Sequence, residues 1–192
     1  MAVFEELLKY YHLDIESYGR LKEAPSFDLI PKIGDREEVQ SAIERFRVAR
    51  DNKEKVLIYG DYDTDGVMAT SIMVKALREF GIKASGYLPS RYLDGYGLTV
   101  DNVEKIAKSG FSLIMTVDNG VTAYDAIARA KELGMDVIVL DHHTLEETRP
   151  VMDILIHPVT LNYGEYPISA GFLSFLFSIS LLLKLYSGLL SP

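Results

Sequence analysis

Three acidic residues stand at alternate positions directly after an apolar run, at Asp61, Asp63 and Asp65. The run Val56–Tyr59 is typical of a parallel strand buried on both faces, and Gly66 opens the helix that follows. Carboxylates this close repel one another unless a cation or water neutralises them. The stretch is therefore a candidate metal site, at the strand end where open α/β sheets bind ligands.

Three other interpretations fit part of this stretch. An EF-hand calcium loop needs a bidentate glutamate six residues after the glycine, but Ile72 occupies that position. The acidic turn can also cap the next helix without any metal. A nucleotide-sugar site built on Asp-x-Asp is the third alternative. The rest of the chain has to decide among them.

Two further polar groups follow later apolar runs. The triplet Asp118–Gly120 comes directly after the strand expected at 112–117, and Asp141–His143 comes directly after the strand expected at 136–140. Taken alone, the first is typical of a turn and the second of packed or surface imidazoles. Together with the acidic stretch, they offer a mixed oxygen and nitrogen site that suits manganese and tolerates magnesium.

The elements that must position these residues alternate between strand and helix. Strands are expected at 56–59, 84–88, 112–117, 136–140 and 153–156, starting about 24 to 28 residues apart over the first four. This spacing implies right-handed crossovers and a parallel sheet. The predicted fold is α/β, a doubly wound, mostly parallel sheet of about five strands flanked by helices. All the polar groups would then meet at one sheet edge.

Helices are expected between these strands and toward both ends of the chain. Side-chain caps are predicted at Asp35, Thr99 and Thr122, the last with Asp125 in a capping box. Residues 1–50 are predicted to form a helical amino-terminal extension without chemistry of its own. Residues 51–192 are predicted to form the α/β domain.

The expected site has the composition of a phosphoester hydrolase. Several carboxylates allow one to bridge two ions, and a metal pair about 3.5–4 Å apart serves in-line displacement at phosphorus. Such ions lower the pKa of bound water and neutralise charge on the phosphate and the leaving oxygen. The residues by themselves therefore predict metal-assisted phosphoester hydrolysis.

The bulk composition limits the class of protein. The chain has 192 residues, 48% hydrophobic and 25% charged, with a net charge of −8. This charge disfavours a polyanion-coating surface, but a metal-loaded carboxylate site is locally positive. With no cysteine, disulfides, thiolate chemistry and cysteine-ligated zinc are excluded, which is compatible with a cytoplasmic location. The amino terminus has no signal-peptide pattern.

The apolar stretch from Ile168 to Leu190 approaches the length of a membrane span. Lys184 interrupts it, and serines and glycines dilute it, which favours a buried helix with no membrane role. If its covering partner is absent, the apolar face from Phe172 to Leu185 would favour self-association of this uncovered helix.

Three motifs, in this order and spacing, resemble the first three motifs of the DHH phosphoesterases: Asp63–Gly66, Asp118–Gly120 and Asp141–His143. The longer forms Gly60–Gly66 and Ser90–Leu98 are similar to the RecJ branch, the exonucleases specific for single-stranded DNA. The resemblance covers about residues 55–175. It implies a DHH phosphoesterase domain that digests single-stranded DNA from 5′ to 3′ in DNA repair and recombination, with replication or repair proteins as further partners.

The resemblance also implies roles for individual residues. Four of them would be manganese ligands, with magnesium as a substitute and two ions in the complete enzyme: Asp63, Asp65, Asp118 and His142. His143 would lie beside the scissile phosphate, and Asp141 would support the histidines. Arg91 would lie near the substrate phosphate, although an ion pair with the neighbouring Asp94 explains it equally well. Asp61 has no implied ligand role and is expected to form local hydrogen bonds.

Two departures and two alternatives accompany this resemblance. The family has a further metal-binding aspartate after the helix expected near the carboxyl end, and a second, substrate-clamping domain; this chain stops at Pro192 without them. We therefore expect an amino-terminal part, with little or no exonuclease activity alone. His157 stands where RecJ relatives tend to have asparagine.

The alternatives are a noncatalytic module that binds nucleic acid or replication partners, and a phosphodiesterase of oligonucleotides or cyclic dinucleotides. Tyr59, in place of a histidine, weighs against the latter.

Overall fold

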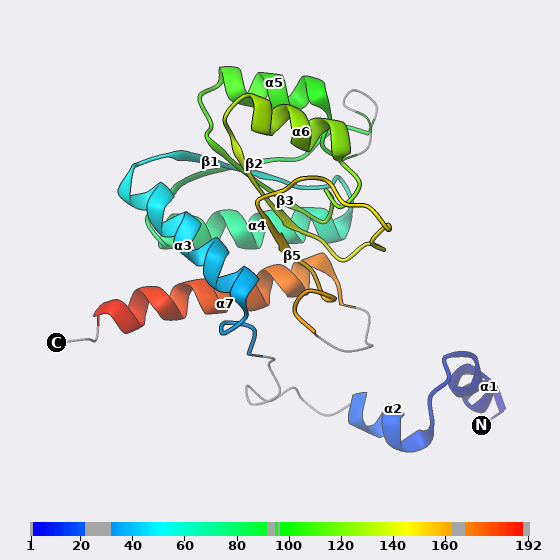
Figure 1. Ribbon diagram of the computed structural model, residues 1–192. Coiled ribbons are helices and arrows are strands. Elements are labelled where there is room, and N and C mark those ends of the chain that lie inside the picture. The colour runs from blue at the N-terminus through cyan, green and yellow to red at the C-terminus, as the bar shows by residue number, and fades with distance from the viewer. Residues whose placement is uncertain (1, 22–31, 92–94, 96, 163–167, 190–192) are drawn as a thin grey trace. The chain divides into compact units, whose positions relative to one another are not determined.

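The chain divides into two compact units, Met1–Pro31 and Lys32–Pro192. The computed structural model describes residues 2–21, 32–91, 95, 97–162 and 168–189. The first unit holds the helices α1 (Ala2–Tyr10) and α2 (Ile15–Leu21) (Figure 1). The sequence predicts that the α/β domain starts at residue 51. The second unit begins earlier, at Lys32, and includes α3 (Glu37–Asp51).

Five parallel strands form a single sheet in the order β2-β1-β3-β4-β5, which confirms the predicted α/β class. The strands are β1 (Lys55–Tyr59), β2 (Lys83–Tyr87), β3 (Leu113–Val117), β4 (Asp136–Leu140) and β5 (Ile154–Ile156). In the register, Tyr59 pairs with Thr116, and Thr116 pairs with Val139. The carboxyl ends of β1, β3 and β4 are therefore level, and the loops that leave them start side by side.

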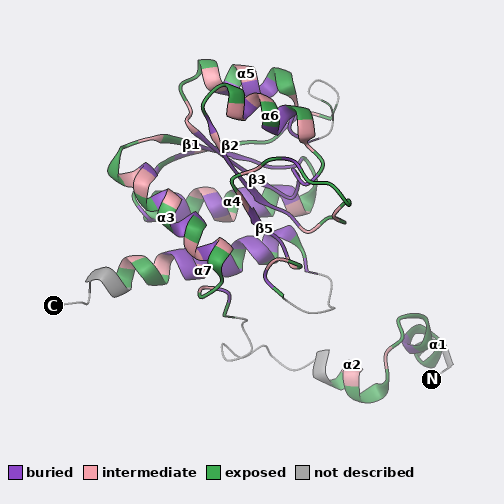
Figure 2. Cartoon of the chain, in the orientation of Figure 1, coloured by how far each residue is buried: buried purple, intermediate pink, exposed green. Residues whose placement is uncertain are grey.

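Helices cover both faces of the sheet (Figure 1). One face carries α5 (Val100–Lys108) and α6 (Tyr124–Glu132), and the other carries α3, α4 (Thr64–Glu79) and α7 (Ala170–Leu189). Strand β3 is buried throughout, and β1 and β4 are buried except at their first residues (Figure 2). Such two-sided burial explains why β1, β3 and β4 are continuous apolar runs without alternation.

Helix α3 is tied to the sheet by charge as well as by its apolar face. Arg45 donates one hydrogen bond from Nε to Asp136 Oδ2 and another from Nη2 to Glu54 Oε2, each with a length of 2.7 Å. These acidic residues lie at the starts of β4 and β1, at the edge opposite the carboxyl ends of the strands. Arg45 therefore ties the polar face of α3 to the starts of β1 and β4.

Of the three predicted side-chain caps, one is confirmed. The Thr99 hydroxyl accepts from the Asn102 amide at 3.3 Å. The caps at Asp35 and Thr122 are wrong, because α3 has Arg36 at its N-cap position and α6 has Ala123, each without a side-chain cap. Each helix starts one residue later than those caps would require, and a threonine or aspartate outside the N-cap position cannot reach the first free amides.

Helix α7 packs against α4 and α3 and is not the uncovered helix that the sequence allowed for. Its inner side chains are buried: Leu173, Leu176, Phe177 and Leu181. The Ser178 hydroxyl donates to the Ser174 carbonyl oxygen at 2.7 Å, so a serine is accommodated in this apolar setting. Phe172 and Phe175 stay partly exposed, and self-association remains a prediction. No helix in the described part of the chain is long and apolar enough to span a membrane.

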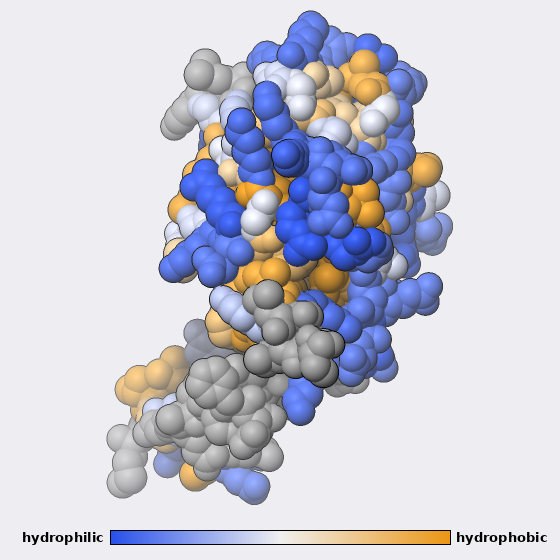
Figure 3. Space-filling view, turned by 90° about the vertical axis from the view of Figure 1, so that its left-hand side faces the viewer, coloured by the Kyte–Doolittle hydropathy of each residue, from blue (hydrophilic) through white to orange (hydrophobic). Residues whose placement is uncertain are grey.

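Hydrophilic and hydrophobic residues are unevenly distributed over the protein surface seen from one side (Figure 3). On the face shown in Figure 3, hydrophilic residues predominate and hydrophobic ones form patches between them. This is the ordinary pattern of a protein surface, on which single apolar side chains need no special explanation.

Candidate metal centre

The acidic loop after β1 depends on a close approach of the α4 backbone. A Cβ atom on Gly66 would lie 2.6 Å from the backbone nitrogen and oxygen of Asp61, so only glycine fits there. Asp63 caps α4, accepting the Gly66 amide at 2.9 Å. Buried Asp61 accepts the Tyr62 amide at 2.7 Å. The first turn of α4 thus fixes the acidic loop. It also directs the Asp65 carboxylate toward His142 and the start of α7.

Asp118 follows β3 in a left-handed conformation with φ of 64°, which a short polar side chain tolerates better than most. The next residue, Asn119, donates from Nδ2 to the carbonyl oxygens of Val117 at 3.0 Å and Tyr59 at 3.3 Å. These bonds join the exits of β1 and β3. They hold Asp118 so that its carboxylate is almost fully buried and directed at the histidine loop.

The histidine loop after β4 is organised by Asp141, which is fully buried. Asp141 Oδ1 accepts the amides of His142 at 2.7 Å and His143 at 3.2 Å, and also contacts His143 Nδ1 at 2.7 Å. Its Oδ2 accepts the Val121 amide at 3.2 Å, from the loop after β3. The Asp141 side chain therefore contacts the backbone of both histidines and the ring of His143, and its supporting role in the site stays a prediction.

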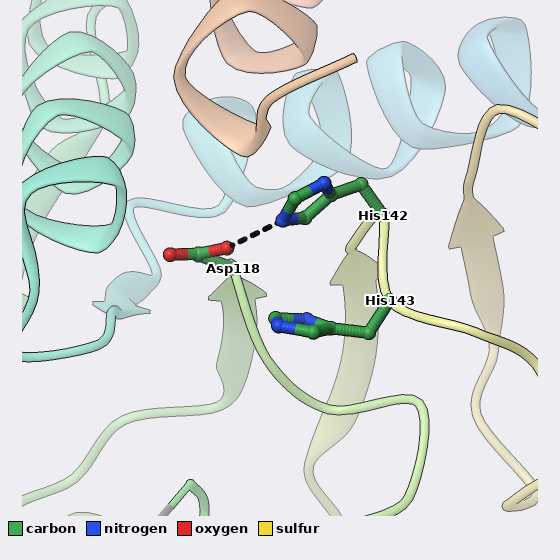
Figure 4. Close-up of side chains that lie close together, drawn as sticks. All are labelled: Asp118, His142 and His143. Carbon is green, nitrogen blue, oxygen red and sulfur yellow. Dashed lines mark ion pairs between the residues drawn. The ribbon is translucent and has the colours of Figure 1, made fainter. Parts of the chain in front are cut away.

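Side chains from three strand exits converge at this edge. Asp118, His142 and His143 can each offer a ligand atom within 4.8 Å of the others (Figure 4). His142 Nε2 lies 3.1 Å from Asp118 Oδ1 and 3.7 Å from Asp65 Oδ2. A second group, with the same 4.8 Å limit, joins Asp118 to Asp63 and to Asp61, for which no ligand role was predicted. Asp118 belongs to both groups, as expected of a carboxylate that could bridge two ions.

Asp65 has a further contact that sequence reasoning missed. Its Oδ2 accepts the Ala170 amide and its Oδ1 the Gly171 amide, both at 2.8 Å. These are free amides at the first turn of α7, where the helix dipole favours a negative charge. The small residues Ala170 and Gly171 were the only feature of the sequence that could have indicated this contact. A Cβ atom on Gly171 would lie 3.0 Å from Asp65 Oδ1, so a small residue leaves room for the carboxylate.

The site concentrates the negative charge of several carboxylates. Among the residues that the structure describes, no lysine or arginine forms an ion pair with any of the site carboxylates. Burial, followed by the charges of Asp65 and Asp63, raises the pKa of Asp118 to about 7. Burial also raises the pKa of Asp61. A buried carboxylate held this close to others is strained in its charged form, and a divalent cation would relieve that strain.

The pKa of His143 moves in the opposite sense from that of a simply buried imidazole. Burial acts to lower it, but the hydrogen bond and charge of Asp141, with Asp118 and Asp61, outweigh burial and raise the pKa of His143. Its Nδ1–H donates to Asp141, which leaves Nε2 directed away from that carboxylate. Asp141 therefore favours the protonated form of the His143 ring relative to a free imidazole.

The raised pKa of Asp118 predicts how stability depends on pH without metal. The folded-state pKa of about 7 exceeds the ordinary 3.8, so between these values the folded protein binds the proton more tightly than the unfolded chain. We expect the Asp118 contribution to lower the free energy of unfolding by on the order of 2–4 kcal/mol between pH 4 and pH 7. Urea unfolding in EDTA at pH 5 and pH 8 measures it, and the Asp118→Asn variant should lack this component. An unchanged pH dependence in that variant would contradict the assignment.

A cavity of about 400 Å³ adjoins His143. Gly97 and Leu98 line one side of it, and the loop from Asn119 to Ala123 lines another. Hollows of 550 and 530 Å³ elsewhere are larger but contain no site residue. Size therefore does not identify the site, whereas the titratable groups do.

Arg91 does not join the converged groups. Its guanidinium lies 5.7 Å from the centroid of the Tyr62 ring, in the loop between Asp61 and Asp63. Asp94, its alternative partner, lies outside the described residues, so neither interpretation of Arg91 is decided.

The oxygen and imidazole donors fit Mn²⁺ or Mg²⁺ better than zinc or copper. Carboxylates predominate, no thiolate is present, and His142 supplies the nitrogen next to Asp118. The predicted ligands Asp63, Asp65, Asp118 and His142 all lie at this one edge. Their individual roles stay predictions.

Comparisons with known proteins agree with this arrangement. The single-stranded-DNA-specific exonuclease RecJ of Bacillus subtilis is 39% identical over 137 residues, which cover 71% of this chain and 17% of that protein. RecJ of Haemophilus influenzae is 40% identical over 121 residues, covering 62% of this chain and 21% of that protein. The chain thus spans only about a fifth of the curated relatives it matches.

Solved structures give the same result. A crystal structure of exonuclease RecJ bound to manganese aligns with a TM-score of 0.72 and 28% identity, over 78% of this chain and 38% of that one. RecJ from Thermus thermophilus in complex with Mn²⁺ aligns with a TM-score of 0.68 and 25% identity, over 79% and 22% of the two chains. The model of the DHH family, N-terminal domain, matches residues 55–179, more than half of the sequence. This chain therefore belongs to the DHH family.

Proposed function

We propose that this chain provides the metal-binding part of a hydrolase that removes nucleotides from single-stranded DNA in the 5′ to 3′ direction. The observation that carries the proposal is the approach of His142 Nε2 to both Asp118 and Asp65, in a member of the DHH family that is similar to RecJ exonucleases. Three loops separated by dozens of residues supply these groups, and a merely structural cluster would not need so many unbalanced carboxylates.

The proposed roles are those that the family resemblance implies, and the closeness of the side chains at this sheet edge supports them. Asp63, Asp65, Asp118 and His142 would hold Mn²⁺, or Mg²⁺ in its place, and the complete enzyme would bind two such ions. When bound, such ions supply an activated water and neutralise charge on the phosphate oxygens. Asp141 keeps the His142 and His143 rings in place through its bonds to their amides.

The substrate side of the site is assigned to two cationic groups. His143, with its Nδ1–H on Asp141, presents Nε2 as a proton donor to a non-bridging phosphate oxygen. Arg91 binds a neighbouring phosphate of the strand, as the family resemblance implies. Both groups would face the phosphates of the DNA strand. The chain as a whole, with a net charge of −8, repels such a polyanion.

Further elements of the proposal concern the cell and the rest of the protein. The substrate would be single-stranded DNA in repair and recombination in the cytoplasm, with replication or repair proteins as partners. We also propose that the additional aspartate implied by the resemblance completes the metal site, and that a second domain clamps the strand. A version extended through that aspartate should bind Mn²⁺ more tightly than this chain in calorimetric titration.

The proposal is tested with a full-length version that includes this chain. We expect Mn²⁺-dependent release of mononucleotides from single-stranded DNA labelled at its 3′ end, with the label retained until late in the digestion. Duplex DNA, RNA of the same sequence, and EDTA serve as controls. Binding of the strand without cleavage would instead support a noncatalytic module, and cleavage confined to dinucleotides or cyclic dinucleotides would support the other phosphodiesterase class.

A further inference from the structure

His157 lies directly after β5 and is buried beside the histidine loop, although no motif of the site includes it. Its ring uses both nitrogens. Nε2 lies 2.9 Å from the carbonyl oxygen of His143, and Nδ1 lies 3.1 Å from the backbone nitrogen of Val159. The Thr160 hydroxyl lies 3.1 Å from the His157 amide and accepts its hydrogen bond. Each polar atom of a buried side chain therefore has a partner.

These partners determine which nitrogen of His157 carries the proton. A backbone amide can only donate, so Nδ1 must accept from Val159 with its lone pair. A carbonyl oxygen can only accept, so Nε2 must carry the hydrogen and donate it to His143. His157 is thus a neutral imidazole in a single tautomer, and a charged ring would leave the Val159 amide facing another donor.

The His143 carbonyl belongs to a loop that is already held on its other side. Asp141 accepts the amides of His142 and His143, while His157 donates to the carbonyl of His143. The backbone pairing of β4 with β5 places the two supporting residues next to each other, since the Asp141 amide donates to Ile156 at 3.1 Å. The peptide segment that carries both histidine rings is therefore fixed through its amides and through its carbonyl.

We propose that His157 is a positioning residue of the metal centre, which fixes the backbone of His142 and His143 and so the distance from His142 to Asp118. The inference depends on the proposed function only for its effect on metal affinity. The orientation of the loop is a property of the protein without metal. Asparagine, with a shorter side chain, would reach only one of the two partners that the imidazole spans.

The first test uses the metal-free protein. A long-range proton–nitrogen spectrum of the wild type should show His157 neutral with the hydrogen on Nε2. In the His157→Phe variant, which keeps a ring but has no hydrogen-bonding atoms, amide exchange at His143 and Thr144 should accelerate at least about tenfold. The His157→Gln variant, which keeps a donor of similar reach, should exchange like the wild type. A hydrogen on Nδ1, or unchanged exchange in the phenylalanine variant, would overturn the proposal.

The second test measures Mn²⁺ affinity by calorimetry. Loss of a partner that orients a ligand typically weakens metal binding about 10- to 100-fold, and we expect this range for His157→Phe and less than about threefold for His157→Gln. Ile106→Ala is the control, because this buried core residue lies in the last turn of α5, which leads to the start of β3 and not to the carboxyl end where the candidate ligands lie. It should lower the unfolding midpoint without changing Mn²⁺ affinity. Equal losses of affinity in His157→Phe and Ile106→Ala would assign His157 a merely structural role and overturn the proposal.

The two tests separate this inference from the proposed function. If the wild type binds no Mn²⁺, the metal site fails, and the spectrum and the amide exchange still decide whether His157 fixes the loop. If the wild type binds Mn²⁺ and His157→Phe binds it equally well, the metal site stands and the positioning role is wrong.

Discussion

The Asp118→Asn variant is expected to lose Mn²⁺-dependent hydrolysis and to bind Mn²⁺ at least about 100-fold more weakly than the wild type. Substitution of residues that only orient ligands already costs about 10- to 100-fold, and Asp118 is shared by both groups of candidate ligands. Asparagine has nearly the same shape, so the left-handed backbone at this position is retained. Calorimetric titration of this chain and nuclease assays of the full-length version measure the two effects.

The same substitution should stabilise the metal-free protein at alkaline pH. It removes a buried charge that Asp65 and Asp63 repel, the cause of the raised pKa of Asp118. Loss of function together with gain of stability is the signature of a site whose charges serve a ligand. Asp101→Asn, at an exposed position in the first turn of α5, is the matched control and should change neither property appreciably. Wild-type turnover in Asp118→Asn would exclude the metal mechanism.

Gly66→Ala is expected to have the second large effect, on stability and on the metal site together. Alanine is favoured over glycine inside a helix by about 1 kcal/mol, which alone would stabilise α4. The added Cβ would, however, lie 2.6 Å from backbone atoms of Asp61, which cannot move without displacing the whole acidic loop. Overpacking of this kind costs about 1–3 kcal/mol, and a backbone collision places it at the upper end. We therefore expect net destabilisation of about 1–2 kcal/mol.

A shift of the loop that carries Asp63 should also weaken Mn²⁺ binding at least about tenfold in Gly66→Ala. Gly134→Ala is the control: its φ of 75° makes alanine strained, but a Cβ there meets no atom within 4 Å, and the residue precedes the start of β4, at the opposite end of that strand from His142. That variant should lose about 1 kcal/mol of stability with unchanged Mn²⁺ affinity. Urea unfolding and calorimetry on the two variants distinguish the effects. Wild-type stability and affinity in Gly66→Ala would show that the first turn of α4 does not set the loop.

Much of the fold could be predicted because its signals are local. Apolar runs mark β1, β3 and β4, Thr99 marks the start of α5, and the spacing of the units implies a parallel sheet. The wrong caps at Asp35 and Thr122 have a local cause as well. A favourable residue type near a helix start does not fix the residue at which the helix begins, and both helices begin one position later than predicted.

The sequence by itself determined the chemistry of this protein, because residue type fixes which donors and charges are available and strand ends place them at a common edge. Tertiary structure alone decided how those groups are held. The bond from Asp65 to the start of α7 spans 105 residues, that from Arg45 to Asp136 spans 91, and the tautomer of His157 depends on a carbonyl 14 residues away. Such contacts leave no periodic pattern, since each depends on where two distant backbones pass each other and not on the order of residues along either one.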